Sequence, residues 1–488
     1  MEMNYLQNPE KKTSHVESPC GFVTSMTRKL KSSAVETMET VKKVGEDDPR
    51  RIMHSMKVGL ALTLVSMFYY FRPLYDGFGQ AGMWAIMTVV VVFEFTVGGT
   101  LSKSINRGSA TLVAGALGIG AEYLANVFGE EGEPVVLGFL VFFIAASSTF
   151  TRFFPNVKRR YDYGILIFIL TFTMVAVSGF RVTQILQLAQ QRLSTIVIGG
   201  ATCMMTSIFV YPVWAGQDLH NLVAGNIEKL GAFLEGFGGE LMLFADENNK
   251  ASSKNDDKTF LQSYKSVLNS KANEESLANF AWWEPPHGRF KFRHPWKQYL
   301  KIGALVRECA CLIEALNGFM NTKSQPKAAA SELQTKIQQP CIKMSRESGK
   351  ALKELSVAIK KMTVPPSAAE THSQNYRAAA VDLQTILGNS SILTPDTKAD
   401  LQQIMPLLVV ASVLIDITGY IDEISRSVHE LSEKACFKSA KPKALLEKQQ
   451  QSQQVLHRGI VRPVDDCVVV EVRDGGDSPE KKDGRSPE

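Results

Sequence analysis

The sequence predicts an all-α membrane protein in which six transmembrane helices are followed by a cytosolic helical bundle. Two observations divide the 488 residues in this way. Nearly all long apolar runs lie before about residue 215, whereas the rest is rich in Lys, Glu, Gln and Ser and repeats its apolar residues every three or four positions. The predicted segments are a basic cytosolic N-terminal segment at 1–49, a transmembrane domain at 50–215, a cytosolic helical domain at 216–437 and a disordered tail at 438–488.

Six apolar stretches come close to the length of a membrane span. A helix rises about 1.5 Å per residue, so crossing a hydrocarbon core about 30 Å thick takes roughly 20 residues. The second stretch contains Glu94 and the third contains Glu122, while the last three contain no charge. The predicted spans are 52–71, 81–101, 109–128, 134–151, 163–180 and 193–215.

The distribution of Lys and Arg orients these spans, because short basic connections stay on the cytosolic side. The N-terminal segment and the connection between the fourth and fifth spans are basic, whereas GEEGEP at 129–134 carries only acidic charges. Both termini are therefore expected in the cytosol, and membrane lipid is an expected partner. We find no catalytic, cofactor-binding, metal-ligand or nucleic-acid-binding motif. No enzymatic activity, cofactor, metal or nucleic-acid partner is predicted.

Charged residues in or beside the spans need partners, because a charge at mid-membrane costs about 2.5 to 3.5 kcal/mol on insertion scales. Glu94 is expected to pair with a basic residue such as Lys57 or Arg107. Arg107 opens the third predicted span and Arg192 the sixth, and each either reaches to the headgroups or points into a pore. Lys57, Arg107, Arg152 and Arg192 are candidates for a pathway that attracts anions, provided that they converge.

The second half is predicted to be a helical bundle. An amphipathic helix is expected from 217 to about 245, and the apolar run at 405–415 is too short for a span, so it favours a buried bundle helix. The segment WWEPPHGRFKFRHPW at 282–296 contains helix-breaking prolines, and we expect it to dock structurally on the bundle or near the membrane. Further helices are predicted at 260–268, 299–319, 328–362 with a break near Pro340, and 400–434.

Several long stretches resemble one known family. They include EDDPRRIMHSMKVGLALTLVS at 46–66, RFFPNVKRRYDYGILIFILTF at 152–172 and WEPPHGRFKFRHPWKQY at 283–299, and with shorter stretches they cover most of residues 46–320. These stretches are similar to the plant aluminium-activated malate transporter family. The resemblance implies a homodimeric, passive anion channel for malate and inorganic anions such as chloride and nitrate. It also implies that Arg107 and Arg192 stand where the family has its pore arginines.

The resemblance carries three further expectations. FVYPVWAGQDLH at 209–220 resembles a stretch through which family members are proposed to be inhibited by gamma-aminobutyrate, which marks Phe209 as a regulatory candidate. The closest motifs resemble plasma-membrane members, so the plasma membrane is favoured over the vacuolar membrane. Aluminium-responsive relatives tend to carry carboxylates between the fifth and sixth spans, and residues 182–187 have none, so aluminium activation is not expected.

Two other functions remain open on the sequence. One is a proton-coupled carboxylate carrier with Glu94 as the proton site. The other is a membrane-anchored scaffold that acts through the cytosolic bundle and the segment at 282–296.

Overall fold

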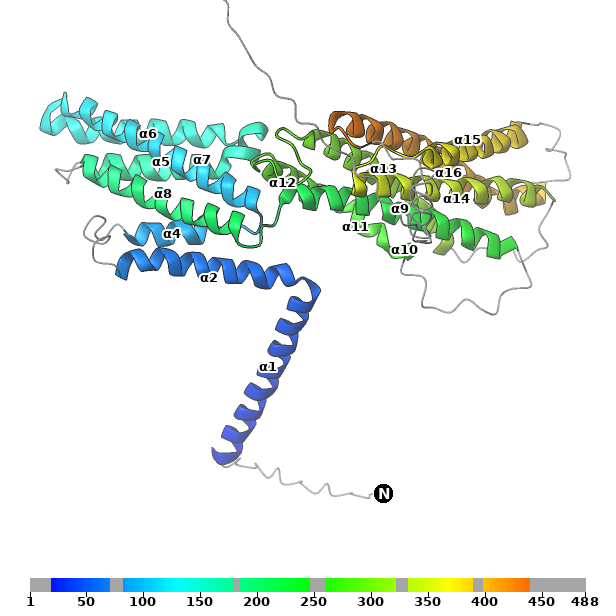
Figure 1. Cartoon of the computed structure of the whole chain (residues 1–488), viewed down its shortest axis with the longest axis horizontal. Helices are drawn as coiled ribbons and strands as arrows, with labels where there is room; N and C mark the ends of the chain where they lie inside the picture. Colours follow the sequence, from blue (N-terminus) through cyan, green and yellow to red (C-terminus); the bar gives the residue numbers. More distant parts are fainter. Residues whose placement is uncertain are drawn as a thin grey trace, which may run out of the picture. The chain divides into compact units, whose positions relative to one another are not determined.

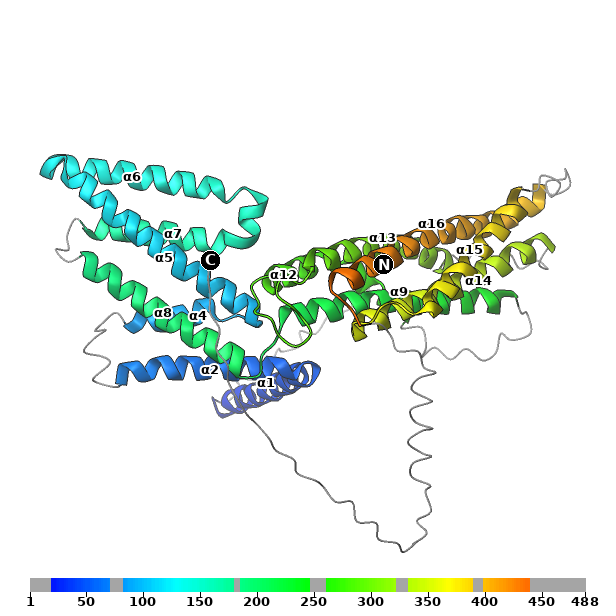
Figure 2. The ribbon, with the colours of Figure 1, turned by 45° about the horizontal axis from the view of Figure 1, so that its top comes forward.

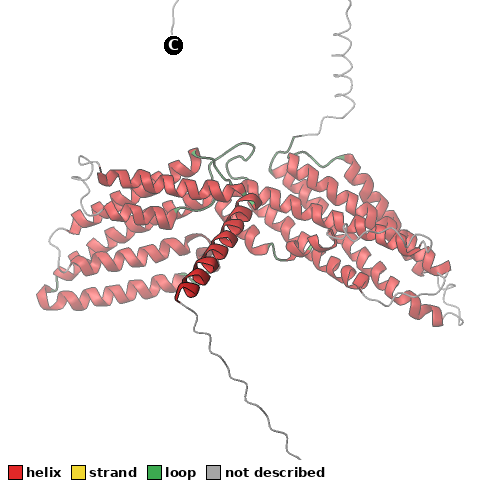
Figure 3. Ribbon diagram, turned by 90° about the horizontal axis from the view of Figure 1, so that it is seen from below, coloured by secondary structure: helices red, strands yellow, loops and turns green. Residues whose placement is uncertain are grey.

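The computed structural model describes residues 19–70, 82–179, 185–245, 260–321, 332–388 and 398–438. Within these ranges the chain is helical and forms no β-strand (Figure 3), and its extended pairings are two isolated bridges. The predicted all-α class is confirmed for this part of the chain. The predicted disordered tail after Lys438 and residues 180–184, between α7 and α8, lie outside the described residues.

The helices of the first half pack side by side, with α6 along one edge and α2 along the other (Figures 1 and 2). Three of the described segments are long and apolar enough to cross a membrane: Glu131–Thr151, Pro155–Ser178 and Gln190–Phe209. α4 is a shorter apolar helix. The helices are α1 (Pro19–Asp47), α2 (Pro49–Tyr70), α4 (Met83–Val92), α5 (Val97–Asn126), α6 (Gly129–Thr151), α7 (Pro155–Gly179) and α8 (Ile185–Phe209).

The outward face of α6 fits an apolar environment. Phe139, Phe142 and Phe143 are 66%, 71% and 61% exposed. Soluble proteins rarely expose such a contiguous aromatic surface to water. Hydrocarbon chains are therefore the natural neighbours of this face.

The structure corrects the bounds predicted for the second and third spans. The second span was expected to run through Leu101, but α4 ends at Val92 and residues 93–96 form a short non-helical break. Thr96 then caps α5, because its side-chain oxygen accepts a hydrogen bond from the Gly99 amide at 3.2 Å. Apolar composition alone does not indicate this break, because Val, Phe and Thr occur in both helical and extended backbone. As a result α5 begins well before the predicted third span and has 30 residues.

Small residues allow close packing between helices of the first half. A β-carbon placed on Gly199 of α8 would lie 2.7 Å from the Ala85 carbonyl oxygen of α4. One placed on Gly118 of α5 would lie 2.8 Å from a methyl group of Val175 on α7. Both distances are below van der Waals contact, so only glycine permits these approaches.

The second half is a bundle with one large apolar core. The helix predicted from residue 217 is present as α9, and its Leu219, Val223, Leu230 and Leu234 are fully buried. α9 packs closely on α14, and the Ser356 hydroxyl donates a hydrogen bond to the Ala224 carbonyl oxygen at 2.7 Å. The bundle helices are α9 (Ala215–Ala245), α10 (Phe260–Ser263), α11 (Lys265–Leu268), α12 (Lys271–Ala281), α13 (Trp296–Asn321), α14 (Glu332–Lys361), α15 (Ser367–Gly388) and α16 (Lys398–Lys434).

The break predicted near Pro340 is absent, because α14 continues through this residue. Proline removes one backbone hydrogen bond, which costs about 3 kcal/mol in an isolated helix. Here Ile337, Cys341 and Met344 on either side of it are almost completely buried in the bundle core. Burial of apolar side chains at about 25 cal/mol per Å² outweighs that loss.

Gly98 generates a testable prediction on stability, because a β-carbon there would lie 2.3 Å from the carbonyl oxygen of Phe280 on α12. Gly98→Ala should lower the free energy of unfolding by about 1 to 3 kcal/mol through overpacking. Gly108→Ala is the matched control on the same helix, since nothing lies within 4 Å of its added carbon. Thermal unfolding of the detergent-purified proteins measures both, and equal effects would contradict the close contact.

Candidate functional site

Three basic side chains are buried in the membrane half. Lys57 on α2, Arg107 on α5 and Arg192 on α8 are 1%, 7% and 8% exposed. A buried charge is unfavourable unless it is paired, so a carboxylate is the usual neighbour. No ion pair between any of these three residues and an Asp or Glu is present among the described residues.

Arg107 is held by a neutral partner. Its guanidinium donates a hydrogen bond to the hydroxyl of Tyr163 on α7 at 3.1 Å, and its Nε is buried without a hydrogen-bond partner in the described part of the chain. The sequence placed this residue at the start of a span. Because α5 begins at Val97, Arg107 instead lies almost three turns into the helix, roughly 15 Å from its start at 1.5 Å per residue. Only 7% of the Arg107 surface is exposed, so the side chain lies against neighbouring helices.

Arg192 is held in a similar way by an aromatic ring. Its guanidinium lies 4.0 Å from the centre of the Trp84 ring of α4, and its Nε is also buried without a hydrogen-bond partner among the described residues. Arg107 and Arg192 lie on α5 and α8, two helices that pack against each other. Two unneutralised guanidinium groups with free N–H donors form an arrangement that an anion would stabilise.

Lys57 lies nearer the end of α8. Its ammonium group donates a hydrogen bond to the Tyr211 carbonyl oxygen at 3.3 Å. Tyr211 follows α8 in a left-handed backbone conformation with a φ of 45°. One turn before Lys57, the Nδ1 atom of His54 is buried without a partner in the described structure. The groups beside the Lys57 side chain are therefore neutral and polar.

Glu94 has a partner other than those predicted. It lies in the break between α4 and α5 and forms an ion pair with Lys103, not with Lys57 or Arg107. The early start of α5 places Lys103 in its second turn, where the side chain reaches back toward the break. Pairing with a basic residue was predicted correctly, but the choice of residue was wrong. Glu94 consequently leaves Lys57 and Arg107 uncompensated.

The remaining two candidates have different surroundings. Arg152 follows α6 and makes two hydrogen bonds to the Asp162 carboxylate, at 2.7 and 3.2 Å, so its charge is compensated. Phe209 is the last residue of α8 and is 73% exposed. Its regulatory role stays a prediction.

Sequence reasoning missed the aromatic partners Trp84 and Tyr163. They lie on other helices than the arginines they contact, and apolar spans commonly contain aromatic residues without any such role. The partner of Glu94 could have been found from a local signal, because Thr96 is one of the residue types that commonly cap the start of a helix. Recognising that cap would have placed Lys103 near Glu94.

Comparison with known proteins identifies the family. A family model described as aluminium activated malate transporter matches residues 42–400, which is more than half of the chain. The chain belongs to the aluminium-activated malate transporter family. Aluminum-activated malate transporter 2 of Arabidopsis thaliana is 52% identical over 406 residues, covering 83% of this chain and 79% of that protein. Aluminum-activated malate transporter 1 of Triticum aestivum is 44% identical over 438 residues, covering 88% and 92%.

Membership in this plant family confirms the resemblance seen in the sequence. The aluminium-activated malate transporters are transporters and not enzymes, so the prediction of a non-enzymatic membrane protein is confirmed. The match begins before α2 and ends in the first turn of α16, and therefore includes both the buried basic residues and most of the helical bundle.

In this member of the aluminium-activated malate transporter family, the segment at 282–296 docks structurally between the two halves. The Glu284 side chain is 1% exposed, and its carboxylate accepts hydrogen bonds from the Ala215 and Gly216 amides at 2.6 and 3.0 Å. These amides begin α9, where a carboxylate is favoured by the helix dipole. Gly98 of α5 also adjoins this side chain, because a β-carbon on Gly98 would lie 2.9 Å from the Cγ atom of Glu284. His287 stacks on Trp214 with the ring centres 3.7 Å apart.

Burial raises the pKa of Glu284 from 4.5 to about 7, although the backbone amides act in the opposite direction. The folded protein therefore holds a proton that the unfolded chain releases between these two values. This contribution to stability is complete below pH 4.5 and is lost as the pH rises through 7.

Glu284→Gln should therefore remove a fall in stability between pH 5 and pH 8. The measurement is the melting temperature against pH, compared as the difference between wild type and variant, so that the titration of His287 and other groups cancels. Glu275→Gln, on the exposed side of α12, is the control and should leave the pH profile unchanged. A Glu284→Gln profile parallel to that of the wild type would refute the assignment.

Proposed function

We propose that this protein is a passive channel for malate and inorganic anions such as chloride and nitrate. The observation that carries the proposal is the pair of buried arginines on adjoining helices, Arg107 and Arg192, whose Nε donors lack partners in the described structure. A transient anion would complete their hydrogen bonds. The names of the relatives support malate as one such anion.

The same charges suit conduction better than tight binding. Neutral partners, the Tyr163 hydroxyl and the Trp84 ring, hold the guanidinium groups in place without cancelling their charge. An anion would then be attracted by two cations and could leave by exchange with a following anion, as channel conduction requires. Lys57 would extend the positive potential toward the end of α8. Arg152, which is paired with Asp162, is not included in this pathway.

Transport would need no coupled energy source. Each elementary charge gains roughly 2.3 kcal/mol per 100 mV, so a malate dianion leaving an inside-negative cell gains about twice that. We further propose six crossings with both termini in the cytosol, a homodimer with the basic pore within or between subunits, and location in the plasma membrane. The basic connection between α6 and α7 supports this orientation. The lack of carboxylates at 182–187 supports a channel without aluminium activation.

Neutralising either arginine tests the pathway. Arg107→Gln and Arg192→Gln should each lower anion current at least about tenfold, because a hydrogen bond to a charged group contributes about 1.5 to 3 kcal/mol and 1.4 kcal/mol is a factor of ten. Arg107→Lys keeps the charge and should retain partial current. Lys158→Gln removes an exposed charge from the same half and is the matched control. Patch-clamp recordings at equal surface expression measure these effects.

The recordings also distinguish the alternatives. The reversal potential of a channel follows the anion gradient alone, whereas that of a proton-coupled carrier shifts with pH as well. Reconstituted protein that passes no current would favour a scaffold. Wild-type current and selectivity in both glutamine variants would exclude the arginines from the pathway.

A further inference from the structure

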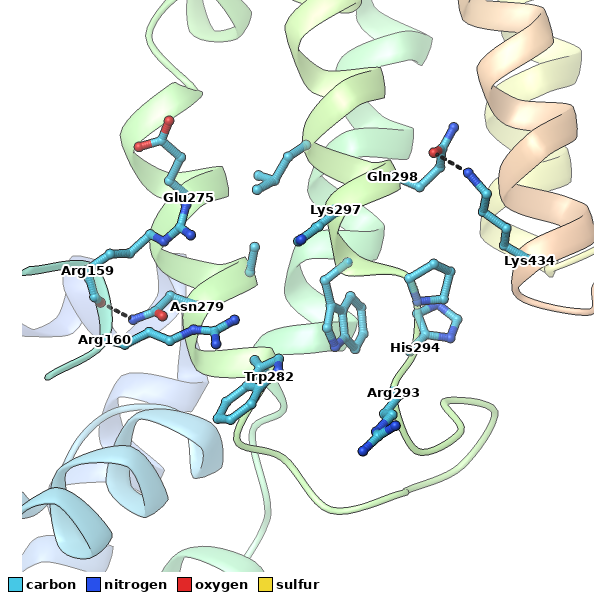
Figure 4. A pocket seen from close by; sticks show the side chains of 14 residues that line it. Arg159, Arg160, Glu275, Asn279, Trp282, Arg293, His294, Lys297, Gln298 and Lys434 are labelled. Atoms are coloured by element: carbon cyan, nitrogen blue, oxygen red, sulfur yellow. Dashed lines mark hydrogen bonds between the residues drawn. The ribbon is translucent and has the colours of Figure 1, made fainter. Parts of the chain in front are cut away.

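A second basic site lies outside the proposed pathway, in a cavity of about 900 Å³ (Figure 4). Its walls come from the first turns of α7, the end of α12, the segment at 282–296, the start of α13 and the end of α16. Among the lining side chains, Glu275 is the one carboxylate in this described cavity. The lining cations are Arg159, Arg160, Arg293, Lys297 and Lys434.

Most of these cations lack a neutralising partner. Within the described residues, Arg159, Arg160, Arg293 and Lys297 form no ion pair, whereas Lys434 lies 3.5 Å from the Glu430 carboxylate. Burial lowers the pKa of the lining residue His294 to about 4, so this imidazole is neutral and adds no charge at neutral pH.

Arg160 is the most constrained of the set. Its guanidinium lies 4.2 Å from the centre of the Trp282 ring, and its Nε is buried without a hydrogen-bond partner in the described part of the chain. A guanidinium stacked on an aromatic ring presents its N–H groups in a fixed plane. Figure 4 shows Arg160 and Lys297 pointing toward the same space from opposite walls.

The arrangement favours phosphate groups as the ligand. Planar guanidinium donors match phosphate oxygens in pairs, and several uncompensated cations require a ligand with several negative charges. The location indicates a headgroup at the membrane surface. Arg159 and Arg160 stand a few residues before the uncharged part of α7, which begins at Tyr163. Phe153 and Trp282 are 78% and 48% exposed, as is common for aromatic residues at a membrane interface. Basic pockets of this kind on the cytosolic side bind phosphoinositide headgroups.

We propose that this cavity binds an anion with several phosphate groups, presented by a polyphosphorylated inositol lipid or by a soluble inositol phosphate of the same chemistry. Bound there, the anion joins α7 of the membrane half to α12, α13 and α16 of the bundle. The inference rests on the membrane orientation proposed above and is independent of which anion is conducted.

Binding to the full chain in phosphatidylcholine nanodiscs tests the proposal. The probes are a short-chain phosphatidylinositol bisphosphate and soluble inositol trisphosphate, and the readout is native mass spectrometry together with quenching of tryptophan fluorescence. The double variant Arg159→Gln/Lys297→Gln removes one charge on α7 and one on α13. Lys271→Gln/Lys343→Gln removes two exposed charges elsewhere on the bundle and is the control. All four side chains are exposed, so neither double variant leaves a cavity in the packed interior.

The expected result is saturable binding that weakens at least tenfold in the Arg159→Gln/Lys297→Gln variant and is unchanged in the control. Binding of the lipid alone would assign the site to a membrane headgroup, and equal binding of both probes would show that the headgroup suffices. Absence of binding at physiological ionic strength, or full affinity in the double variant, would overturn the proposal. Headgroup binding by a protein that passes no current would refute the channel function and leave this site intact.

Discussion

Thr96 caps α5 and so fixes the position of every charge on that helix. With the helix beginning at Val97, Lys103 reaches back to Glu94, and Arg107 lies well inside the helix beside Tyr163. A helix beginning twelve residues later would give Glu94 no local partner and would leave Arg107 at an exposed end. Because of this cap, Glu94 pairs with Lys103, and Arg107 and Arg192 have no carboxylate partner among the described residues. The proposed anion pathway depends on this difference in pairing.

Several helices can be predicted from the sequence, because run length and residue spacing are local patterns. Apolar run length indicates the helices α6, α7 and α8, and the three-to-four spacing of Leu219, Val223 and Leu230 indicates α9. The sequence also shows that Arg107 and Arg192 lie in or beside apolar stretches, where a charge needs an explanation. What the sequence does not record is contact between helices. The partners Tyr163 and Trp84 belong to other helices, and the choice of Lys103 for Glu94 depends on a break that apolar composition conceals.

Three of the contacts between the two halves involve the starts of α2, α5 and α9. Glu284 accepts hydrogen bonds from the first amides of α9, and Phe280 lies directly against Gly98 near the start of α5. Arg50 joins the start of α2 to α9 through Asp218 at 2.9 Å. A displacement of α9 or α12 would therefore act first on the starts of α2 and α5. These two helices contain Lys57 and Arg107. The basic cavity beside α12 adjoins this junction, which offers a physical route from headgroup binding to the buried charges.

We propose that Arg107 and Arg192 bind the conducted anion directly. Anomalous scattering from crystals soaked in bromide, which substitutes for chloride, tests this binding. We predict a bromide peak within hydrogen-bonding distance of the Nε of Arg107 or Arg192. Bromide bound elsewhere, with both guanidinium groups paired to carboxylates, would contradict the claim.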